Sequence, residues 1–362
     1  MRNREKRKPS GREGRLLSGR EDKFRPAPSA GIDYFRIAAA FLVIAIHTAP
    51  FSIWNKNVDF LLTYCFGRVA VPFFFMTTGY FVLAPYVRSG FRKKRSFYRF
   101  MVKNTAVYLA VTALYMPLTI YSGNMPKDIF GWGKALAFDG TFYHLWYFPA
   151  VLVGCILLVW LSGVGCAWMA MLCVTAAYVI GLFGDSYYGA VEGVDWLKAV
   201  YAGIFRVSSY TRNGIFFAPL FLMLGMGIAF MRELYPKRVC VWGLAVSAVL
   251  LAGEGFLTYS LKWQRHNSMY VCLAPVMFFL FQLLLRFQGK APAFTRKGSL
   301  VLYVIHPAVI VVLRGIAERL GLTKLLVANT FVQYVSVCAV SLLAAFVFVK
   351  LSASVGGRLR KS

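Results

Sequence analysis

The chain has 362 residues, of which 59% are hydrophobic, and a formal net charge of +27 at pH 7. Soluble domains are roughly 45–50% apolar by a similar count, so this composition is not that of an ordinary soluble protein. Apolar windows of about 20 residues, long enough to cross a bilayer, recur along the sequence. They predict an all-α, polytopic membrane bundle. The basic residues lie between these windows, as the positive-inside rule expects, which argues against nucleic acid as a partner.

A long apolar region lies between two basic ends. Residues 1–30 are rich in Lys and Arg and poor in apolar residues, which predicts a disordered cytoplasmic tail. Residues 31–351 form the predicted transmembrane domain, and residues 352–362 form a short basic cytoplasmic tail. About ten spans can be placed in chain order by length and hydropathy. They lie near residues 32–52, 63–84, 100–120, 144–162, 165–183, 212–231, 239–257, 268–287, 299–315 and 328–350.

The distribution of charge sets the expected topology. Basic residues concentrate in the two tails and in residues 85–99, 232–238 and 286–297, which an even number of spans places on one side. We therefore expect a multi-pass protein of the cell membrane with both termini in the cytoplasm. The seven cysteines include no C-x-x-C pair and mostly lie in apolar runs. They predict neither a metal site nor a disulfide framework.

The first span carries ionisable residues that lipid cannot satisfy. It reads D-Y-F-R-I-A-A-A-F-L-V-I-A-I-H from Asp33 to His47. Arg36 and His47 are about three helical turns apart, so they share one face of the helix at a separation of roughly 16 Å. Asp33 is close enough to Arg36 to pair with it. This polar stripe is predicted to face protein or water, because each such group costs several kcal/mol in lipid.

Separate spans supply further ionisable residues at a similar depth, which predicts one shared polar cavity. The candidate catalytic residues are His47, Arg36 and Arg68, and the candidate substrate-binding residues are Asp33, His144, Trp146, Arg212, Asn213, Glu254 and His306. Each also has a structural explanation when taken alone. Arginines near span ends can snorkel to the interface. His144 can belong to an interfacial aromatic belt, Glu254 can balance an arginine, and His306 can fill the kink made by Pro307.

These residue types favour proton transfer and anion binding. Histidine accepts and donates protons near neutral pH, and arginine binds phosphate or carboxylate. The sequence contains no nucleophile elbow, phosphate-binding glycine loop or H-E-x-x-H motif, so nucleotide hydrolysis and zinc chemistry are not indicated. A histidine base that deprotonates a hydroxyl, with donor phosphates held by cations on the cytoplasmic side, fits the polarity of the first span.

Four motifs resemble those of the acyltransferase-3 membrane O-acyltransferases. They are R-x10-H in the first span, R-V-A-V-P-F-F-F-M-T-T-G-Y, H-L-W-Y-F-P and L-Y-V-I-H-P. The resemblance implies transfer of an acyl group, acetyl above all, from cytoplasmic acyl-CoA to a hydroxyl. The acceptor would be a cell-envelope glycan, peptidoglycan or lipid, with no tightly bound cofactor. His47 would be the general base, Arg36 would line the acyl-CoA path, and Arg68 would serve the same cavity. Thr78 stands where the family often has Ser.

The stretches I-D-Y-F-R-I-A-A-A-F-L-V-I-A-I-H-T-A-P-F and T-R-N-G-I-F-F-A-P resemble the membrane half of vancomycin-resistance serine racemases. That branch normally continues into a racemase domain, and because this chain ends at Ser362 we expect no racemase chemistry from it. The resemblance raises an alternative, transport or binding of a small amino acid such as serine. Arg212 or Arg68 would then hold the carboxylate, and Glu254 the ammonium group. A second open point is the basic 88–99 loop, which either anchors to lipid headgroups or also binds CoA phosphates.

Overall fold

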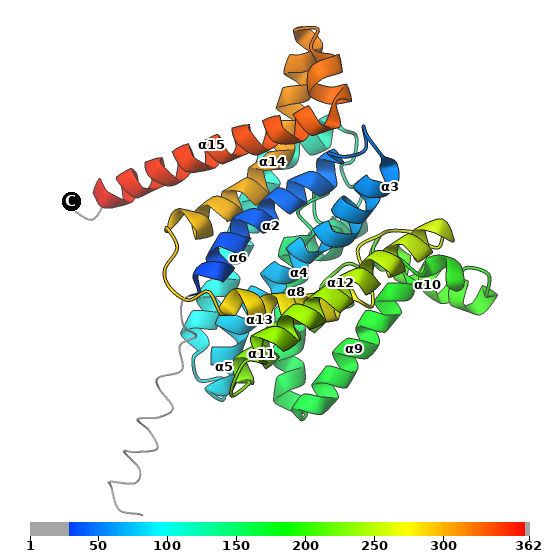
Figure 1. Cartoon of the computed structure of the whole chain (residues 1–362), viewed down its shortest axis with the longest axis vertical. Helices are drawn as coiled ribbons and strands as arrows, with labels where there is room; N and C mark the ends of the chain where they lie inside the picture. Colours follow the sequence, from blue (N-terminus) through cyan, green and yellow to red (C-terminus); the bar gives the residue numbers. More distant parts are fainter. Residues whose placement is uncertain (1–28, 359–362) are drawn as a thin grey trace, which may run out of the picture.

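The computed structural model describes residues 29–358, and all of its regular structure is helical (Figure 1). Helix accounts for 76% of the chain, and the described part contains no strand. Residues 1–28 of the first predicted tail and 359–362 of the second lie outside the described residues, whereas residues 352–358 continue the last helix. The first helix, α2, is Ala30–Thr48. The remaining α-helices are α3 (Lys56–Asp59), α4 (Ala70–Thr78), α5 (Ala84–Arg88), α6 (Lys94–Tyr121), α7 (Ile129–Lys134), α8 (Tyr147–Val164), α9 (Ala167–Phe183), α10 (Asp195–Val207), α11 (Ala218–Phe230), α12 (Lys237–Ser260), α13 (Leu273–Leu285), α14 (Phe294–Arg319) and α15 (Thr330–Arg358).

The predicted fold class, a polytopic helical membrane bundle, is confirmed. Six helical stretches are long and apolar enough to cross a membrane, and three shorter apolar helices, α9, α11 and α13, accompany them. The six are Ala30–Thr48, Lys56–Arg88, Tyr147–Val164, Lys237–Ser260, Phe294–Arg319 and Thr330–Ser354. Each of the ten predicted spans overlaps a helix. The predicted third span corresponds to α6, which begins with the basic residues Lys94 and Arg95.

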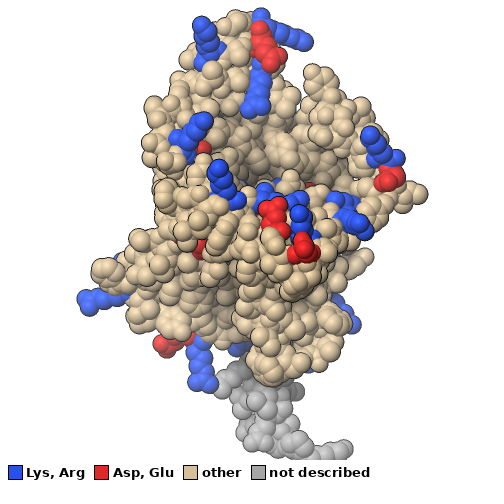
Figure 2. Space-filling model, turned by 90° about the vertical axis from the view of Figure 1, so that its right-hand side faces the viewer, with Lys and Arg blue, Asp and Glu red and all other residues tan. Residues whose placement is uncertain are grey.

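The sequence did not predict α10, which lies between two spans. Its residues Trp196 and Val200 are exposed whereas Tyr201 is buried, so its faces differ in burial. Figure 2 looks onto the side of the molecule that carries α3 and α10 in Figure 1, and charged side chains are scattered there over a mostly uncharged surface. Helix α10 thus packs one face on the protein, where the Tyr201 hydroxyl donates to the carbonyl of Ile180 at 2.8 Å, and leaves the other face exposed.

The start of α2 is fixed by contacts with the last turn of α13. The hydroxyl of Ser29 caps α2 by accepting from the N–H of Ile32 at 3.2 Å, and it donates to the carbonyl of Leu284 at 2.9 Å. A side chain on Gly31 would lie 2.3 Å from the same carbonyl oxygen, so only glycine fits there. Helix α2 then packs against α4, α13, α14 and α15. These contacts fix the rotation of α2 and therefore the direction of its polar stripe.

The run from α3 to α5 is one long helix with local changes of pitch. A π-helical segment, η1 (Phe60–Cys65), is followed by a 3-10 segment, η2 (Phe66–Val69), and a second π-helical segment, η3 (Gly79–Leu83), precedes α5. Such changes of pitch rotate the side chains that follow them, and they are frequent at functional sites. Arg68 lies in the 3-10 segment.

Candidate active site

Two pockets lie at different levels of the bundle. The first, which we call the Arg36 pocket, has a volume of about 250 Å³. Its walls come from α2, the α4–η3 run, α6, α8 and α14, and they are Arg36, Phe74, Thr77, Thr78, Phe81, Val82, Phe100, Lys103, Asn104, Val107, Tyr147, Arg296, Ser299, Leu300 and Tyr303. Six of these residues are apolar, and Arg36, Lys103 and Arg296 are its charged groups.

The second pocket, the His47 pocket, has a volume of about 460 Å³. It is lined by the end of α2, by Arg68, and by the loops that precede α8, α11 and α13. The residues are Ile46, His47, Tyr64, Arg68, Tyr143, Arg212, Gln264, Arg265, His266 and Asn267. The polar stripe of α2 therefore reaches both pockets, but Arg36 and His47 do not share one crevice as the sequence predicted.

An arginine pair surrounds Asp33 at the edge of the Arg36 pocket. Arg36 Nε lies 3.5 Å from an Asp33 carboxylate oxygen, as the sequence predicted for this pair. Arg296, 263 residues away in sequence, binds the same carboxylate with two guanidinium nitrogens at 2.8–3.0 Å. Asp33 is buried and does not itself line the pocket. The two arginines share one negative charge, which leaves net positive charge at this pocket.

Three histidines from different helices and loops form the layer between the two pockets. The rings of His47 and His306 are stacked with centroids 5.4 Å apart, and His144 lies 5.5 Å from His306. Tyr303, which lines the Arg36 pocket, lies 6.2 Å from His306. A chain of ring contacts, from Tyr303 through His306 to His47, thus links the wall of one pocket to the wall of the other.

The described residues offer few partners to these ring nitrogens. His306 Nδ1 lies 3.2 Å from the carbonyl oxygen of Leu302, and a carbonyl can only accept, so Nδ1 carries the hydrogen. His306 Nε2 and both nitrogens of His144 are buried without a hydrogen-bond partner in the described structure. His306 Nε2 is therefore a hydrogen-bond acceptor held next to His47.

The backbone around Pro307 is held open by a tyrosine from another helix. The hydroxyl of Tyr115 donates to the carbonyl of Val304 at 2.6 Å and accepts from the N–H of Ala308 at 3.2 Å. It is inserted where a direct helical hydrogen bond between those two residues would run. Pro307 lacks the N–H that would reach the carbonyl of Tyr303, and Tyr115 bridges the next pair of groups along the helix. Tyr115 thereby fixes the stretch of α14 that carries His306.

The substitution Tyr115→Phe is expected to lower the free energy of unfolding by about 1–3 kcal/mol, because it leaves a buried N–H and a carbonyl without partners. The measurement is the thermal unfolding midpoint of the full chain in nanodiscs. Tyr121→Phe is the control, because Tyr121 lies in the same helix but is 88% exposed. Equal, small effects of the two changes would show that the inserted hydroxyl does not hold the kink.

Arg68 and Arg212 face the His47 pocket from separate segments. Arg68 donates to the side-chain oxygen of Asn267. The guanidinium carbon of Arg212 lies 5.1 Å from the ring centroid of Trp146 and 4.6 Å from that of Tyr210. The Nε atoms of both arginines are buried and have no hydrogen-bond partner in the described structure.

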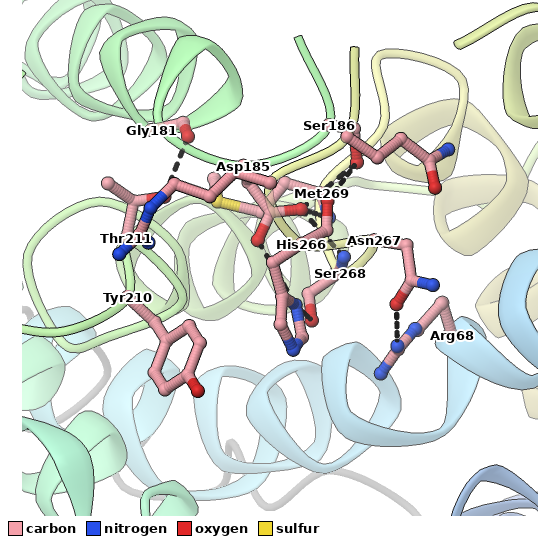
Figure 3. Close-up of polar contacts among 12 residues, drawn as sticks. Arg68, Gly181, Asp185, Ser186, Tyr210, Thr211, His266, Asn267, Ser268 and Met269 are labelled. Carbon is pink, nitrogen blue, oxygen red and sulfur yellow. Dashed lines mark hydrogen bonds and ion pairs between the residues drawn. The ribbon is translucent and has the colours of Figure 1, made fainter. Parts of the chain in front are cut away.

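Asp185 and His266, which the sequence analysis missed, form a dyad beside Arg68 (Figure 3). His266 Nδ1 lies 3.4 Å from an Asp185 oxygen, and the other carboxylate oxygen accepts from the N–H groups of Ser268 and Met269 at 2.7 and 2.9 Å. Burial, aided by the charge of Arg212, lowers the pKa of His266 to about 4. Burial works against ionisation of Asp185, but its hydrogen bonds outweigh this and lower the pKa of Asp185. His266 is therefore neutral at pH 7, with Nδ1 directed at the carboxylate.

Two predicted substrate-binding residues hold the backbone instead of facing a pocket. Glu254 accepts from the Tyr187 hydroxyl and from the N–H groups of Val271 and Cys272, at 2.6–2.8 Å. It binds the backbone at the start of α13 and does not line the His47 pocket, and its predicted substrate-binding role stays a prediction. Asn213 is buried and accepts from the N–H groups of Ile215 and Phe216. It shapes the turn that presents its neighbour Arg212.

The remaining predicted residues lie in or directly behind the site. Arg36, His47, Arg68 and Arg212 line the pockets. His144 and His306 are fully buried beside them, and Trp146 supports Arg212. Sequence reasoning missed Arg296, Tyr303, His266, Gln264 and Asn267. The polar run W-Q-R-H-N-S between two spans is the signal that could have indicated the last three.

Comparison with known proteins identifies the family. The acyltransferase-3 family, described as an acyltransferase domain, matches residues 29–350. An amino-acid racemase of Enterococcus faecalis is 39% identical over 334 residues, which are 90% of this chain and 45% of that protein. A second amino-acid racemase of the same organism is 35% identical, over 89% of this chain and 46% of that protein. A serine/alanine racemase of Enterococcus gallinarum is 34% identical, over 85% of this chain and 44% of that protein.

The chain spans about half the length of these curated relatives. No solved structure matches it. The family match covers most of the chain, including every residue that lines the two pockets. The chain therefore belongs to the acyltransferase-3 family.

Proposed function

We propose that the protein moves an acyl group, acetyl above all, from acyl-CoA in the Arg36 pocket to a hydroxyl of an acceptor in the His47 pocket. One observation carries this proposal: two polar pockets approach each other from different levels of a membrane bundle and are separated by a histidine layer. Such an arrangement would let a cytoplasmic donor and an acceptor in the cell envelope react without either molecule crossing the bilayer.

The Arg36 pocket suits the donor. Arg36 and Arg296 leave net positive charge beside Asp33, and Lys103 adds to it, which favours phosphate groups. Phe74, Val82 and other apolar side chains line the inner wall. They fit the uncharged arm that carries the thioester, while the nucleotide part stays outside near the basic 88–99 loop. We place this side, with both termini of the chain, in the cytoplasm of a cell whose plasma membrane holds the protein.

The reaction needs one proton transfer to His47 and one proton transfer away from it. A nitrogen of His47 accepts the proton of the acceptor hydroxyl, and the hydroxyl oxygen attacks the thioester carbonyl carbon. The C–S bond then breaks, the new ester forms, and the thiolate of CoA takes the proton from the imidazolium. Arg68 or Arg212 would stabilise the negative oxygen of the intermediate. The acceptor would belong to a glycan, peptidoglycan or lipid of the cell envelope.

The experiment that tests this function uses the purified full chain in proteoliposomes with acetyl-CoA and an envelope extract as the source of acceptor. Release of CoA thiol that depends on the extract, together with labelled acetyl in an ester, is the expected result. Uptake of labelled serine by the same vesicles is measured in parallel. Serine accumulation without CoA release would replace acyl transfer by the transport alternative, whose expected ammonium partner, Glu254, caps a helix in this structure.

The substitution Arg36→Gln is expected to raise the KM for acyl-CoA about tenfold or more, because a charge-assisted contact with phosphate contributes about 1.5–3 kcal/mol. The control is Lys290→Gln, which removes an exposed positive charge from the loop before α14 and should leave the KM unchanged. Initial rates at varied acetyl-CoA measure both. An equal rise of the KM in the two variants would mean that Arg36 acts only through the overall positive charge on the side of the Arg36 pocket.

A further inference from the structure

The His47 pocket has a one-sided distribution of charge. Arg68, Arg212 and Arg265 line it, and none of its lining residues is Asp or Glu. His266 is neutral at pH 7, so the arginines supply the positive charge. The other polar groups are amides and hydroxyls, from Gln264, Asn267 and two tyrosines. These neutral groups can donate and accept hydrogen bonds but cannot balance three cations.

The two inner arginines have no carboxylate partner among the described residues. The ion pairs found in that part of the chain involve Arg36, Lys134, His266 and Arg296, and neither Arg68 nor Arg212. Arg212 rests on the rings of Trp146 and Tyr210, and Arg68 donates to Asn267. Aromatic and amide contacts orient a guanidinium group but leave its charge uncompensated.

Asp185, an acid behind the His266 side of this pocket, is already engaged. Asp185 accepts from the N–H groups of Ser268 and Met269 and pairs with His266, which stands on the pocket side of it. The Asp185 carboxylate therefore fixes the loop that carries His266 and Asn267 (Figure 3). Its charge acts on Arg68 and Arg212 through space, but it forms no ion pair with either of them among the described residues.

Buried cations are ordinarily paired, because removing an unpaired charge from water is costly. Here the buried Nε atoms of Arg68 and Arg212 stay without partners beside a cavity of about 460 Å³. Such a cavity concentrates anions, because its charges have one sign and its walls are poorly polarisable. A bound anionic group would supply the missing partner, and the planar guanidinium groups match the paired oxygens of carboxylate or phosphate.

We propose that the acceptor of this enzyme is an anionic molecule whose carboxylate or phosphate group is held by Arg68 and Arg212 while its hydroxyl reaches His47. This inference rests on the proposed acyl transfer and narrows its acceptor to one chemical class. It disfavours a zwitterion such as a free amino acid, because no acid lines the pocket to hold an ammonium group. It also assigns the phosphates of CoA to the Arg36 pocket and not to this one.

The experiment measures binding without an acyl donor, so it does not depend on turnover. Dissociation constants are taken from the thermal unfolding of the full chain in nanodiscs with two matched pairs of probes. Glycerol is compared with glycerol 3-phosphate, and methyl glucoside with methyl glucuronide. In at least one pair, the anionic probe is expected to bind at least tenfold more tightly than the neutral probe. Its affinity is expected to fall as the salt concentration rises. The better anionic probe shows whether phosphate or carboxylate is preferred.

The variants Arg212→Gln and Arg68→Gln are expected to weaken binding of that anionic probe at least tenfold. The variant Arg212→Lys is expected to weaken it less. Arg212→Lys keeps the charge and serves if Arg212→Gln does not fold. The control Arg206→Gln removes an exposed charge from α10 outside the pocket and should leave binding unchanged. Equal binding of neutral and anionic probes, or anion binding that survives both Gln variants, would overturn the proposal.

Two further arms separate the possible sources of failure. CoA itself is titrated against Arg36→Gln and Arg212→Gln, and loss of CoA binding in the second variant alone would assign the pocket to donor phosphate and overturn the inference. If the chain binds the anionic probes as predicted but never consumes acyl-CoA, acyl transfer is refuted and the anion-binding site remains. Acyl transfer at equal rates to neutral and anionic acceptors would refute the anionic acceptor and leave the proposed function.

Discussion

Replacing His47 by Gln is expected to lower the rate of acyl transfer by about 10²–10⁴-fold, the usual contribution of a positioned general base. His47 is the ionisable residue of α2 that lines the proposed acceptor pocket. It is stacked on His306 at 5.4 Å and meets Tyr143 edge to face at 4.8 Å. Glutamine keeps a hydrogen-bonding side chain of similar length but cannot take a proton at neutral pH. The loss should therefore appear in kcat, with little change in the KM for acyl-CoA.

The same preparation supplies the controls for the His47 variant. Its unfolding midpoint and its affinity for CoA should match those of the original chain, because we propose that the donor binds in the Arg36 pocket. Rates within threefold of the original would assign the proton transfer to another group, of which His266 is the one that lines the same pocket.

The largest effect on stability is expected from Gly225→Ala. Helix α11 and the α4–η3 run cross at two glycines that face each other's backbone. A Cβ on Gly225 would lie 2.1 Å from the carbonyl oxygen of Met76, and one on Gly79 would lie 2.0 Å from that of Leu222. Backbone atoms cannot turn aside as a flexible side chain can, so the helices must move apart. Overpacking a core typically costs 1–3 kcal/mol, and contact with backbone puts this change at about 3 kcal/mol or more.

Gly227→Ala is the matched control for this prediction. Gly227 lies in the same helix, and a Cβ there would meet nothing within 4 Å. The control should be neutral or gain up to about 1 kcal/mol, because alanine favours helix more than glycine does. Thermal unfolding in nanodiscs measures both variants. Similar midpoints for Gly225→Ala and Gly227→Ala would contradict the close crossing of the two helices.

The sequence predicted the features that depend on local periodicity. The helical spans follow from apolar runs of bilayer length, and the pairing of Asp33 with Arg36 follows from their spacing within one helix. The shared face of Arg36 and His47 also follows from helical geometry. Periodicity does not predict which side chains from another helix lie between Arg36 and His47. Tyr303 and His306 lie between the two levels, so the stripe serves two pockets.

Features that depend on distant partners could not be predicted from the sequence. Arg296 reaches Asp33 across 263 residues, and Tyr115 reaches the Pro307 kink of another helix. Glu254 was expected in the cavity because it is the acid inside an apolar run. The structure instead uses it to satisfy the N–H groups at the start of α13, an equally good way to stabilise a buried carboxylate. Burial cost alone does not distinguish those two solutions.

The most direct test of the two-pocket arrangement is a structure of the full chain in nanodiscs with an acyl-CoA analogue whose thioester sulfur is replaced by carbon, which prevents transfer. We predict density for the phosphates beside Arg36 and Arg296, with the arm passing Tyr303 and the acyl carbonyl next to His47. Density for the nucleotide in the His47 pocket, or an arm that ends in the Arg36 pocket far from the histidines, would contradict it.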